Sequence, residues 1–343
     1  MTEPVTEPMA EPMNGKASGR RPADGGSTRR DVAPENVVLR RVRDHGVYAA
    51  TGVLLVFNLA FTPNFATVGN LRLQLVQVVP IAIVALGMAL VVATEGIDLS
   101  VGSVMAITAA TIPLYLGYGP WAAVAVGIAA GVAVGALNGT LVAFCGIQPI
   151  IATLGVLVAG RAVALVIADG RLVEIFDPTL QSLGNGTVAG FPVTVLIVAA
   201  LSVAVLVAVR WSLFGRRLVA IGGNRTAARL AGLPVRRTLL TVYIASGALA
   251  ALAGVVNTAR LGASDPSFVG LLIELSAITA VVVGGTPLSG GRIRVVGTLM
   301  GALLMQLIAA TVIQHDLPDS VARMIQAAII VGAVYVQRDR GGA

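Results

Sequence analysis

Charged residues, aromatic residues, histidine, cysteine and lysine are all scarce in this chain. Of its 343 residues, 12% are charged and 4% are aromatic, whereas 56% are hydrophobic. Soluble globular domains carry about one quarter charged residues, so this composition excludes an ordinary water-soluble domain. The apolar residues stand in long runs separated by short charged stretches, which is the pattern of transmembrane helices. We therefore predict an all-α fold, that of a polytopic helical membrane protein.

The scarce residues also exclude several kinds of site. Lys16 is the only lysine, and it is followed by Ala17 instead of the Ser or Thr that a phosphate-binding P-loop requires. With one cysteine, Cys145, the chain can form no internal disulfide, and His45 and His315 are too far apart in sequence to suggest a metal cluster. We expect no catalytic residue, no metal and no cofactor bound by this chain. Cys145 is interpreted as a small buried hydrophobic residue.

Composition along the chain predicts three parts. Residues 1–44 contain a repeated Thr-Glu-Pro, glycine, serine and mixed charge, which are typical of a disordered tail. Because this tail has no apolar core near its start, it does not have the form of a secretory signal, and we expect it to stay in the cytoplasm. Residues 45–338 are predicted to form the transmembrane domain, and residues 339–343 a cytoplasmic C-terminus.

The apolar runs predict ten membrane spans, because a helix needs about 17 to 25 apolar residues to cross a bilayer. They lie at about 47–62, 76–94, 99–117, 120–145, 147–168, 192–209, 239–260, 276–290, 295–314 and 318–336. Two of them, 47–62 and 276–290, are short, and the second contains three glycines and a proline. It is therefore a candidate for a broken or re-entrant helix, which a membrane protein tolerates only where protein or a cavity surrounds it.

One long basic loop sets the orientation. Residues 210–237 contain seven arginines and no Asp or Glu, and loops rich in arginine are usually cytoplasmic. The even number of spans before this loop then places both termini in the cytoplasm and the acidic segment 169–177 outside. The same rule explains the net charge of +7 better than nucleic-acid binding does. We predict a multi-pass protein of the cytoplasmic membrane with no nucleic-acid partner.

Two glycine-rich turns resemble each other. Gly96-Ile-Asp-Leu-Ser-Val-Gly102 and Gly285-Thr-Pro-Leu-Ser-Gly-Gly291 share Gly, Leu, Ser and Gly at matching positions, and both are predicted at the inner end of a helical hairpin. Transporters often contain repeats that bring two broken elements together at the substrate path. The likeness predicts an internal repeat, with chance similarity as the alternative.

The basic loop also contains a short helical pattern, Thr226-Ala-Ala-Arg-Leu-Ala-Gly232. Thr226 can cap its N-terminus, and Gly232 with the following Pro234 can end it. We interpret this helix as a contact for another protein; the alternative is a loop that only sets the orientation.

Four segments of the chain form specific motifs: Ala93-Thr-Glu-Gly-Ile-Asp-Leu-Ser-Val-Gly-Ser103, Leu137-Asn-Gly139 with Ile147-Gln-Pro-Ile-Ile-Ala-Thr-Leu-Gly155, Phe214-Gly-Arg-Arg-Leu-Val-Ala-Ile-Gly-Gly-Asn224, and Gly284-Gly-Thr-Pro-Leu-Ser-Gly-Gly-Arg292. In these motifs the chain resembles the permease subunits of bacterial ABC importers, specifically the ribose, xylose and related monosaccharide permease family. The resemblance covers about residues 76–336. The family's coupling pattern, Ala-Ala-x-x-x-Gly, matches residues 227–232, whereas Thr226 stands where the family usually has glutamate.

The resemblance implies a permease that pairs with a second copy in the bilayer, binds ABC ATPase subunits that use ATP, and receives its solute from an extracytoplasmic solute-binding protein. It implies import of a monosaccharide, with ribose as our first choice and a nucleoside or autoinducer-2 as alternatives. A permease without its own P-loop needs such an external motor, which agrees with the residues themselves.

Candidate functional residues fall into three groups. Coupling to the ATPase is assigned to Arg216, Arg217, Arg225, Thr226, Ala227, Ala228, Arg229 and Gly232. The translocation pathway or its gating is assigned to Glu95, Gly96, Asp98, Ser100, Asn138, Gln148, Thr153, Arg161, Gly285 and Ser289, chiefly because polar groups inside spans are costly unless they have a role. Docking of the binding protein is assigned to Arg72, Arg260, Asp265 and Glu274.

Structural alternatives exist for each group. Glu95 and Asp98 can be merely solvated, polar residues such as Asn138 can cross-link helices, and the four docking residues can belong to a wet loop. Arg161 lies too deep in its span to reach the surface, so we expect it to face protein or the pathway.

Three other functions compete with the permease hypothesis. An ion-coupled secondary transporter needs a carboxylate or unwound carbonyls near the midplane, and the predicted spans place no Asp or Glu near their centres. A non-transporting assembly protein leaves the basic loop without a purpose. Intramembrane hydrolysis lacks paired aspartates or a Ser/His arrangement.

Overall fold

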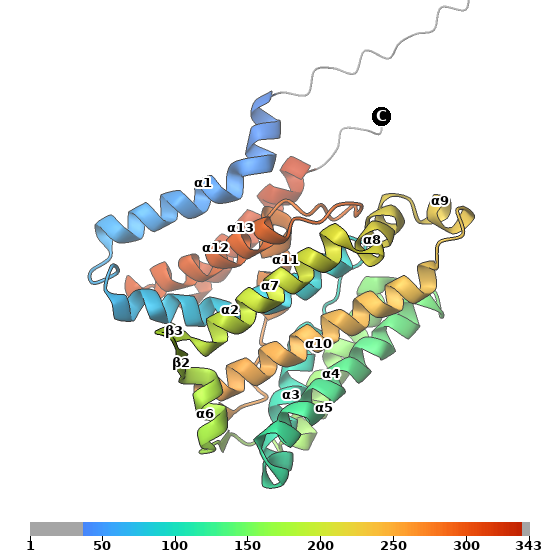
Figure 1. Ribbon diagram of the computed structural model, residues 1–343. Coiled ribbons are helices and arrows are strands. Elements are labelled where there is room, and N and C mark those ends of the chain that lie inside the picture. Colours follow the sequence, from blue (N-terminus) through green and yellow to red (C-terminus); the bar gives the residue numbers. More distant parts are fainter. Residues whose placement is uncertain (1–36, 338–343) are drawn as a thin grey trace, which may run out of the picture. The chain divides into compact units, whose positions relative to one another are not determined.

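Helices form over most of the apolar sequence in the computed structural model, which describes residues 37–337 (Figure 1). The helices are α1 Val37–Phe61, α2 Val68–Val92, α3 Val101–Tyr115, α4 Pro120–Ala143, α5 Pro149–Ile167, α6 Pro178–Asn185, α7 Val193–Trp211, α8 Leu213–Gly223, α9 Arg225–Leu230, α10 Val235–Leu261, α11 Ile273–Val283, α12 Val295–Gln314 and α13 Asp319–Gln337. A short 3₁₀ turn, Leu116–Tyr118, extends α3. The all-α, polytopic prediction is confirmed.

Four two-residue strands were not predicted. β1 (Val173–Glu174) pairs antiparallel with β4 (Ala263–Ser264), and β2 (Thr187–Val188) pairs with β3 (Phe191–Pro192). The β1–β4 pair joins the end of α10 to the loop that follows α5, so both lie at one end of the bundle.

The predicted tail and C-terminus fall largely outside the described residues. Only residues 37–44 of the tail are described, and they form the start of α1 instead of a disordered segment. The predicted C-terminus, 339–343, lies wholly outside.

Seven helices of the described part are long and apolar enough to cross a membrane: α2, α3 with its 3₁₀ turn, α4, α5, α7, α10 and α12. The other three predicted spans fall on α1, α11 and α13, whose apolar stretches are shorter. Every predicted span therefore overlaps a helix, that at 276–290 only in part, while the count of ten crossings stays a prediction.

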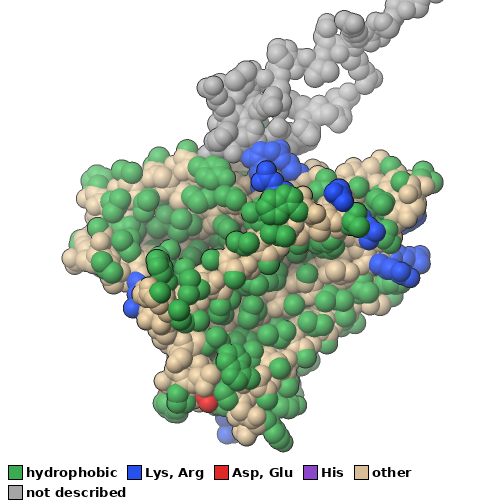
Figure 2. Space-filling model, in the orientation of Figure 1, with side chains coloured by type: hydrophobic (Ala, Val, Ile, Leu, Met, Phe, Trp, Pro, Cys, Tyr) green, Lys and Arg blue, Asp and Glu red, His purple; other side chains and the backbone are tan. Residues whose placement is uncertain are grey.

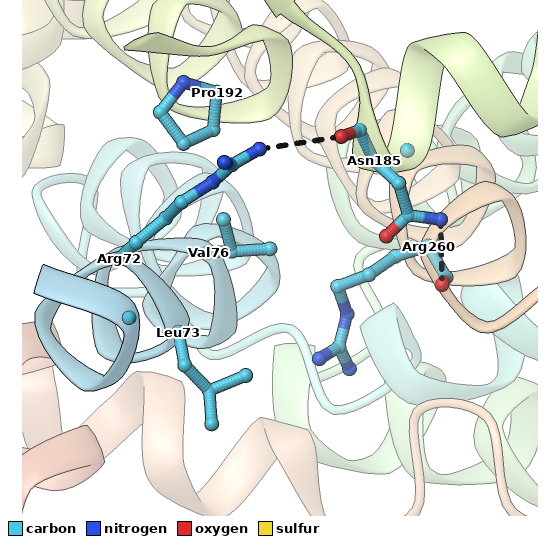
Figure 3. Close-up of a pocket in the computed structure, with 8 residues that line it drawn as sticks. Arg72, Leu73, Val76, Asn185, Pro192 and Arg260 are labelled. Carbon is cyan, nitrogen blue, oxygen red and sulfur yellow. Dashed lines mark hydrogen bonds between the residues drawn. The ribbon is translucent and has the colours of Figure 1, made fainter. Parts of the chain in front are cut away.

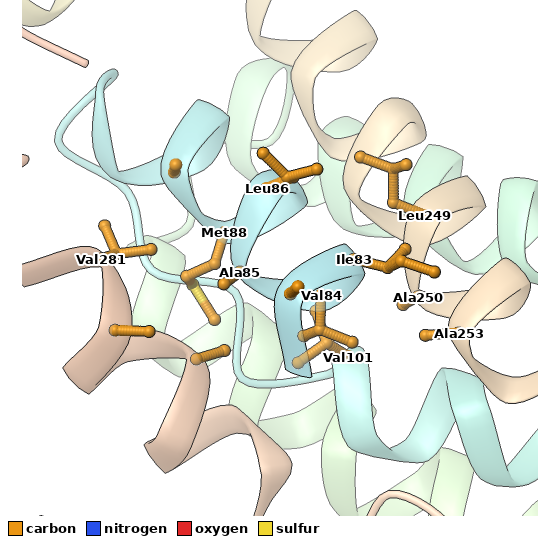
Figure 4. Close-up of a cluster of buried hydrophobic side chains, with 14 of the residues drawn as sticks. Ile83, Val84, Ala85, Leu86, Met88, Val101, Leu249, Ala250, Ala253 and Val281 are labelled. Carbon is orange, nitrogen blue, oxygen red and sulfur yellow. The ribbon is translucent and has the colours of Figure 1, made fainter. Parts of the chain in front are cut away.

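The core forms around α2 and α10. Figure 4 shows Ile83 and Leu86 of α2 beside Leu249 of α10, with Val101 of α3 and Val281 of α11 close by. The helices approach closely because small residues line their contacts: a Cβ atom at Gly247 of α10 would lie 3.0 Å from the backbone of Gly135 in α4. In membranes such small-residue contacts bring helix backbones together.

The segment between α10 and α12 is broken, as the sequence suggested for 276–290. The helical part, α11, spans 273–283 and follows an unwound stretch, residues 265–272, that runs along α3. A second irregular stretch, 284–294, follows α11. A discontinuous element therefore stands at the predicted span. The glycines and the proline that suggested a break lie in the stretch after α11, whereas the unwound stretch before α11 was not predicted.

The basic helices α8 and α9 lie at the opposite end of the bundle from β2, β3 and α6 (Figure 1). Arginine side chains gather at this end, and Figure 2 shows them over α8 and α9. This separation agrees with the predicted orientation, in which residues 210–237 are cytoplasmic.

Candidate functional site

The basic loop contains two helices where the sequence predicted one. α8 was missed, and α9 begins two residues earlier than a cap at Thr226 predicts. Its N-cap is Asn224, whose Oδ1 accepts a hydrogen bond from the Ala227 amide at 2.9 Å, so the assignment of the cap to Thr226 is wrong. Gly232 ends the helix as predicted: its φ of 75° is left-handed, a conformation that glycine adopts without strain.

The coupling candidates divide into exposed and buried residues. Arg216, Arg217, Thr226, Ala227, Arg229 and Gly232 are exposed, and Arg225 is partly exposed. Ala228 is buried in a small apolar cluster with Ile221 and Leu239, so it anchors α9 to the bundle. Leu230, which the sequence analysis missed, is 85% exposed. Its place three residues after Ala227 puts both on one face of the helix, and that spacing was a usable signal.

The end of α8 lies against both glycine-rich turns, a contact that we call the coupling junction: Gly222 and residues 93–95 and 290–291. The Gly291 amide donates to the Ala93 carbonyl at 3.0 Å, and Gly222 packs against both residues. Arg225 donates from Nη2 to the Thr94 carbonyl at 3.1 Å. The structure thus brings together three segments that the sequence analysis singled out separately.

Both helices that precede these turns end in the same way. Glu95 after α2 and Gly285 after α11 have left-handed φ values of 62° and 88°. The next amides, of Gly96 and Thr286, donate to carbonyls five residues back, at 3.1 Å each, which is the Schellman pattern. Glu95 therefore corresponds to Gly285, one residue away from the alignment that the sequence suggested. The turns then differ in length, so duplication stays a prediction.

Asp98 lies in the first of the two glycine-rich turns, residues 96–102, and organises a buried polar network. Its Oδ1 accepts from the Ser100 amide at 3.0 Å and hydroxyl at 2.6 Å, and its Oδ2 accepts from the Ser246 hydroxyl of α10 at 2.8 Å. Asn138 of α4 donates to the Ser100 hydroxyl at 2.7 Å. Asp98 is 1% exposed, so the alternative that it is merely solvated is wrong. Ser246 was not among the residues predicted from the sequence.

Two more side chains reach the same turn. Thr153 of α5 donates to the Ile97 carbonyl at 3.1 Å. The Tyr243 hydroxyl of α10 is buried beside Gly96, and among the described residues it has no hydrogen-bond partner. The first turn is therefore held by α4, α5 and α10 together.

The remaining pathway candidates lie outside the Asp98 network. Glu95 and Ser289 are exposed, as is Gln148 at the start of α5. Arg161 donates from Nη1 to the carbonyls of Pro266 and Val269, at 2.9 and 2.7 Å. It faces protein, as expected. Cys145 is exposed, because it follows the end of α4, so the prediction of a buried thiol is wrong.

Two of the four docking candidates share one pocket of about 330 Å³ at the end of the bundle that carries α6. Figure 3 shows Arg72 of α2 and Arg260 of α10 in its wall. Arg72 donates to the Asn185 carbonyl at 3.5 Å, and the Asn185 amide donates to the Arg260 carbonyl at 3.2 Å. None of the eight residues that line the pocket is acidic.

The other two docking candidates differ from these. Asp265 is partly exposed and accepts from the Ser267 amide at 3.0 Å. Glu274 is 6% exposed because it lies in the first turn of α11, against α3. Its burial excludes the wet-loop alternative and removes Glu274 from the docking surface of this conformation.

Comparison with known proteins shows the family to which this chain is similar. Residues 70–334 match the family described as branched-chain amino acid transport system / permease component. The ribose import permease protein of Escherichia coli K12 is 37% identical over 294 residues, which cover 84% of this chain and 91% of that protein. The galactofuranose transporter permease protein of the same strain is 36% identical over 263 residues, or 76% of this chain and 77% of that protein. Its D-allose transport system permease protein is 32% identical over 303 residues, or 86% and 91%. No solved structure matches the chain.

Proposed function

Because the chain belongs to the family of branched-chain amino acid transport system permease components, we propose that it is the membrane permease of an ABC importer for a monosaccharide, with ribose as the first candidate. The sugars in the relatives' names support the solute class. The coupling junction carries the proposal, because it connects an exposed helix on the basic loop to the turns at the ends of two membrane segments.

The exposed side of α9 binds the ATPase. Ala227 and Leu230 offer an apolar contact, and Arg229 adds a charged one beside them. Ala228, packed beneath, transmits the force of that contact to the bundle. The ATPase supplies the ATP chemistry, which this chain, lacking a P-loop, does not perform.

Movement of α8 reaches the membrane interior through the coupling junction. A shift of Gly222 displaces both turns, and the Asp98 network passes the displacement of the first turn to α4 and α10. Closure of the ATPase subunits thereby changes the access of the pathway from one side to the other. A second copy of the chain forms the other half of the transporter.

At the opposite end, the arginine pocket receives the extracytoplasmic solute-binding protein. Arg72 and Arg260 face a pocket without acidic residues, so an Asp or Glu side chain of the partner can form charge-assisted hydrogen bonds with them. This pairing orients the binding protein over the pathway.

Uptake of labelled ribose into proteoliposomes that hold the permease, its ATPase and its binding protein tests the proposal. A Leu230→Glu variant should lose ATP-driven uptake, because it places a charge in the apolar contact with the ATPase. Leu172→Glu is the matched control: Leu172 is also exposed, at 56%, but lies in the loop after α5. If Leu230→Glu took up as much ribose as Leu172→Glu does, the proposed role of α9 would be refuted.

A further inference from the structure

The discontinuous element 265–283 carries a charged residue deep in the bundle. Gly284, just after α11, packs against Gly297 in the first turn of α12. Residues 290–291, between these two glycines, belong to the coupling junction at the basic end of the bundle. The C-terminal end of α11 therefore lies near that basic end. Glu274 precedes Gly284 by ten residues, roughly 15 Å along a helix. That is about half of the roughly 30 Å hydrocarbon core. This distance puts Glu274 near the middle of the membrane, where the predicted spans place no carboxylate.

The Glu274 carboxylate is held against α3, but one of its oxygens has no hydrogen-bond partner among the described residues. A Cβ atom at Gly102 would lie 2.5 Å from its Oε2 atom, so this oxygen rests on the first turn of α3. Glu274 also belongs to the first turn of α11, and the N-termini of helices stabilise negative charge. Within the described residues, Oε2 is buried without a hydrogen-bond partner.

Arg161 supplies the opposite charge from α5. Only its Nη1 atom donates hydrogen bonds to described residues, both to carbonyls of the unwound stretch. Arg161 and Glu274 attract each other electrostatically, yet the described part of the chain contains no ion pair between them within 4.0 Å. The two charges are thus held apart, each with unused hydrogen-bonding capacity.

The unwound stretch in front of these residues cannot face lipid. Irregular backbone is tolerated at membrane depth only against protein or a water-filled cavity. Here the stretch exposes Ser267 and Phe268, the latter by 73%, and Arg161 is itself partly exposed. Gly270 and Leu272 have left-handed φ values of 70° and 59°, so the stretch is folded as turns and not as a continuous helix.

From this arrangement we infer that Arg161 and Glu274 form a site for a hydroxyl group of the transported solute, at mid-membrane on a water-filled path. A hydroxyl is both donor and acceptor: it donates to Oε2 of Glu274 and accepts from the free nitrogens of Arg161. Oε2 is covered in this conformation, and movement of 265–272 uncovers it. The inference rests on the proposed function and names the part of the pathway that contacts a polyhydroxylated solute.

Thiol accessibility in the full chain, placed in lipid nanodiscs without ATPase or binding protein, tests the site. The exposed Cys145 is first changed to Ser, and Phe268→Cys is added. A membrane-impermeant thiol reagent should modify Cys at 268, and ribose should slow the modification. In Glu274→Gln, half-protection should need about tenfold more ribose, the size expected for one hydrogen bond to a charged group. Glu174→Gln, an exposed residue of β1, should leave protection unchanged.

Several results would overturn the inference. No reaction at position 268 would mean that this face is sealed, and no protection by ribose would mean that the face does not hold the sugar. Equal protection with Gln at position 274 would reduce the pair to a structural role. Ribose protection without any ATP-driven uptake would instead refute the proposed function and leave the site standing.

Discussion

Replacing Gly222 by alanine should separate ATP hydrolysis from solute uptake. A Cβ atom at this position would overlap backbone atoms of Ala93 and Gly291. Backbone atoms cannot rotate away as a flexible side chain does, so the only relief is to move α8 away from the two turns. Overpacking of this kind costs about 1–3 kcal/mol, and a factor of ten corresponds to about 1.4 kcal/mol. The equilibrium constant for forming the junction should therefore fall about 5- to 150-fold.

The assay is the ratio of ribose taken up to ATP hydrolysed, in proteoliposomes of the complete transporter. For Gly222→Ala this ratio should fall about tenfold, while the ATPase remains bound through α9. Gly223→Ala is the matched control, because a Cβ atom there would meet nothing within 4 Å. An unchanged ratio for Gly222→Ala would refute the idea that force passes through the junction.

Three further predictions concern the surrounding structure. Asp98→Asn leaves one acceptor oxygen where Ser100 and Ser246 use two, so it should lower stability by about 1–3 kcal/mol; thermal unfolding in detergent measures this, and unchanged stability would contradict the network. Arg72→Glu and Arg260→Glu should weaken binding-protein affinity about tenfold or more, measured by titration onto immobilised permease. Arg171→Glu, whose side chain is 77% exposed, should not. Ala228→Glu buries a charge in the α9 cluster, so trypsin should cut residues 225–237 faster than in the wild type; an equal rate would show that Ala228 does not anchor α9.

Much of the fold could be predicted, because the apolar runs are long and well separated. Every predicted span overlaps a helix, and Gly232 marks the end of α9 as expected. α8 was hidden because Gly215 and Gly222 interrupt its helical pattern, although both lie on its packed side. The cap was misassigned because Asn224 and Thr226 are both good caps, and only the structure shows which side chain accepts the amide.

The candidate site could be predicted only in part. Asp98, Ser100 and Asn138 were found because polar groups inside spans are informative, but Ser246 and Tyr243 were not, since a lone polar residue in a long apolar helix does not show which turn it meets. Glu274 was placed outside because the span was assigned to 276–290. The unwound stretch before it has no hydrophobic period, and sequence alone could not show that this stretch runs back into the membrane.

The central claim is that this chain transports a sugar by means of a separate ATPase, and one measurement tests it most directly. Ribose uptake is compared in proteoliposomes that contain the permease and its binding protein, with and without the ATPase, and with ionophores that abolish ion gradients. We expect ribose uptake only when the ATPase and ATP are present, and we expect the ionophores to have no effect on it. Uptake without the ATPase, abolished by the ionophores, would contradict it and would make Glu274 the coupling carboxylate of an ion-driven transporter.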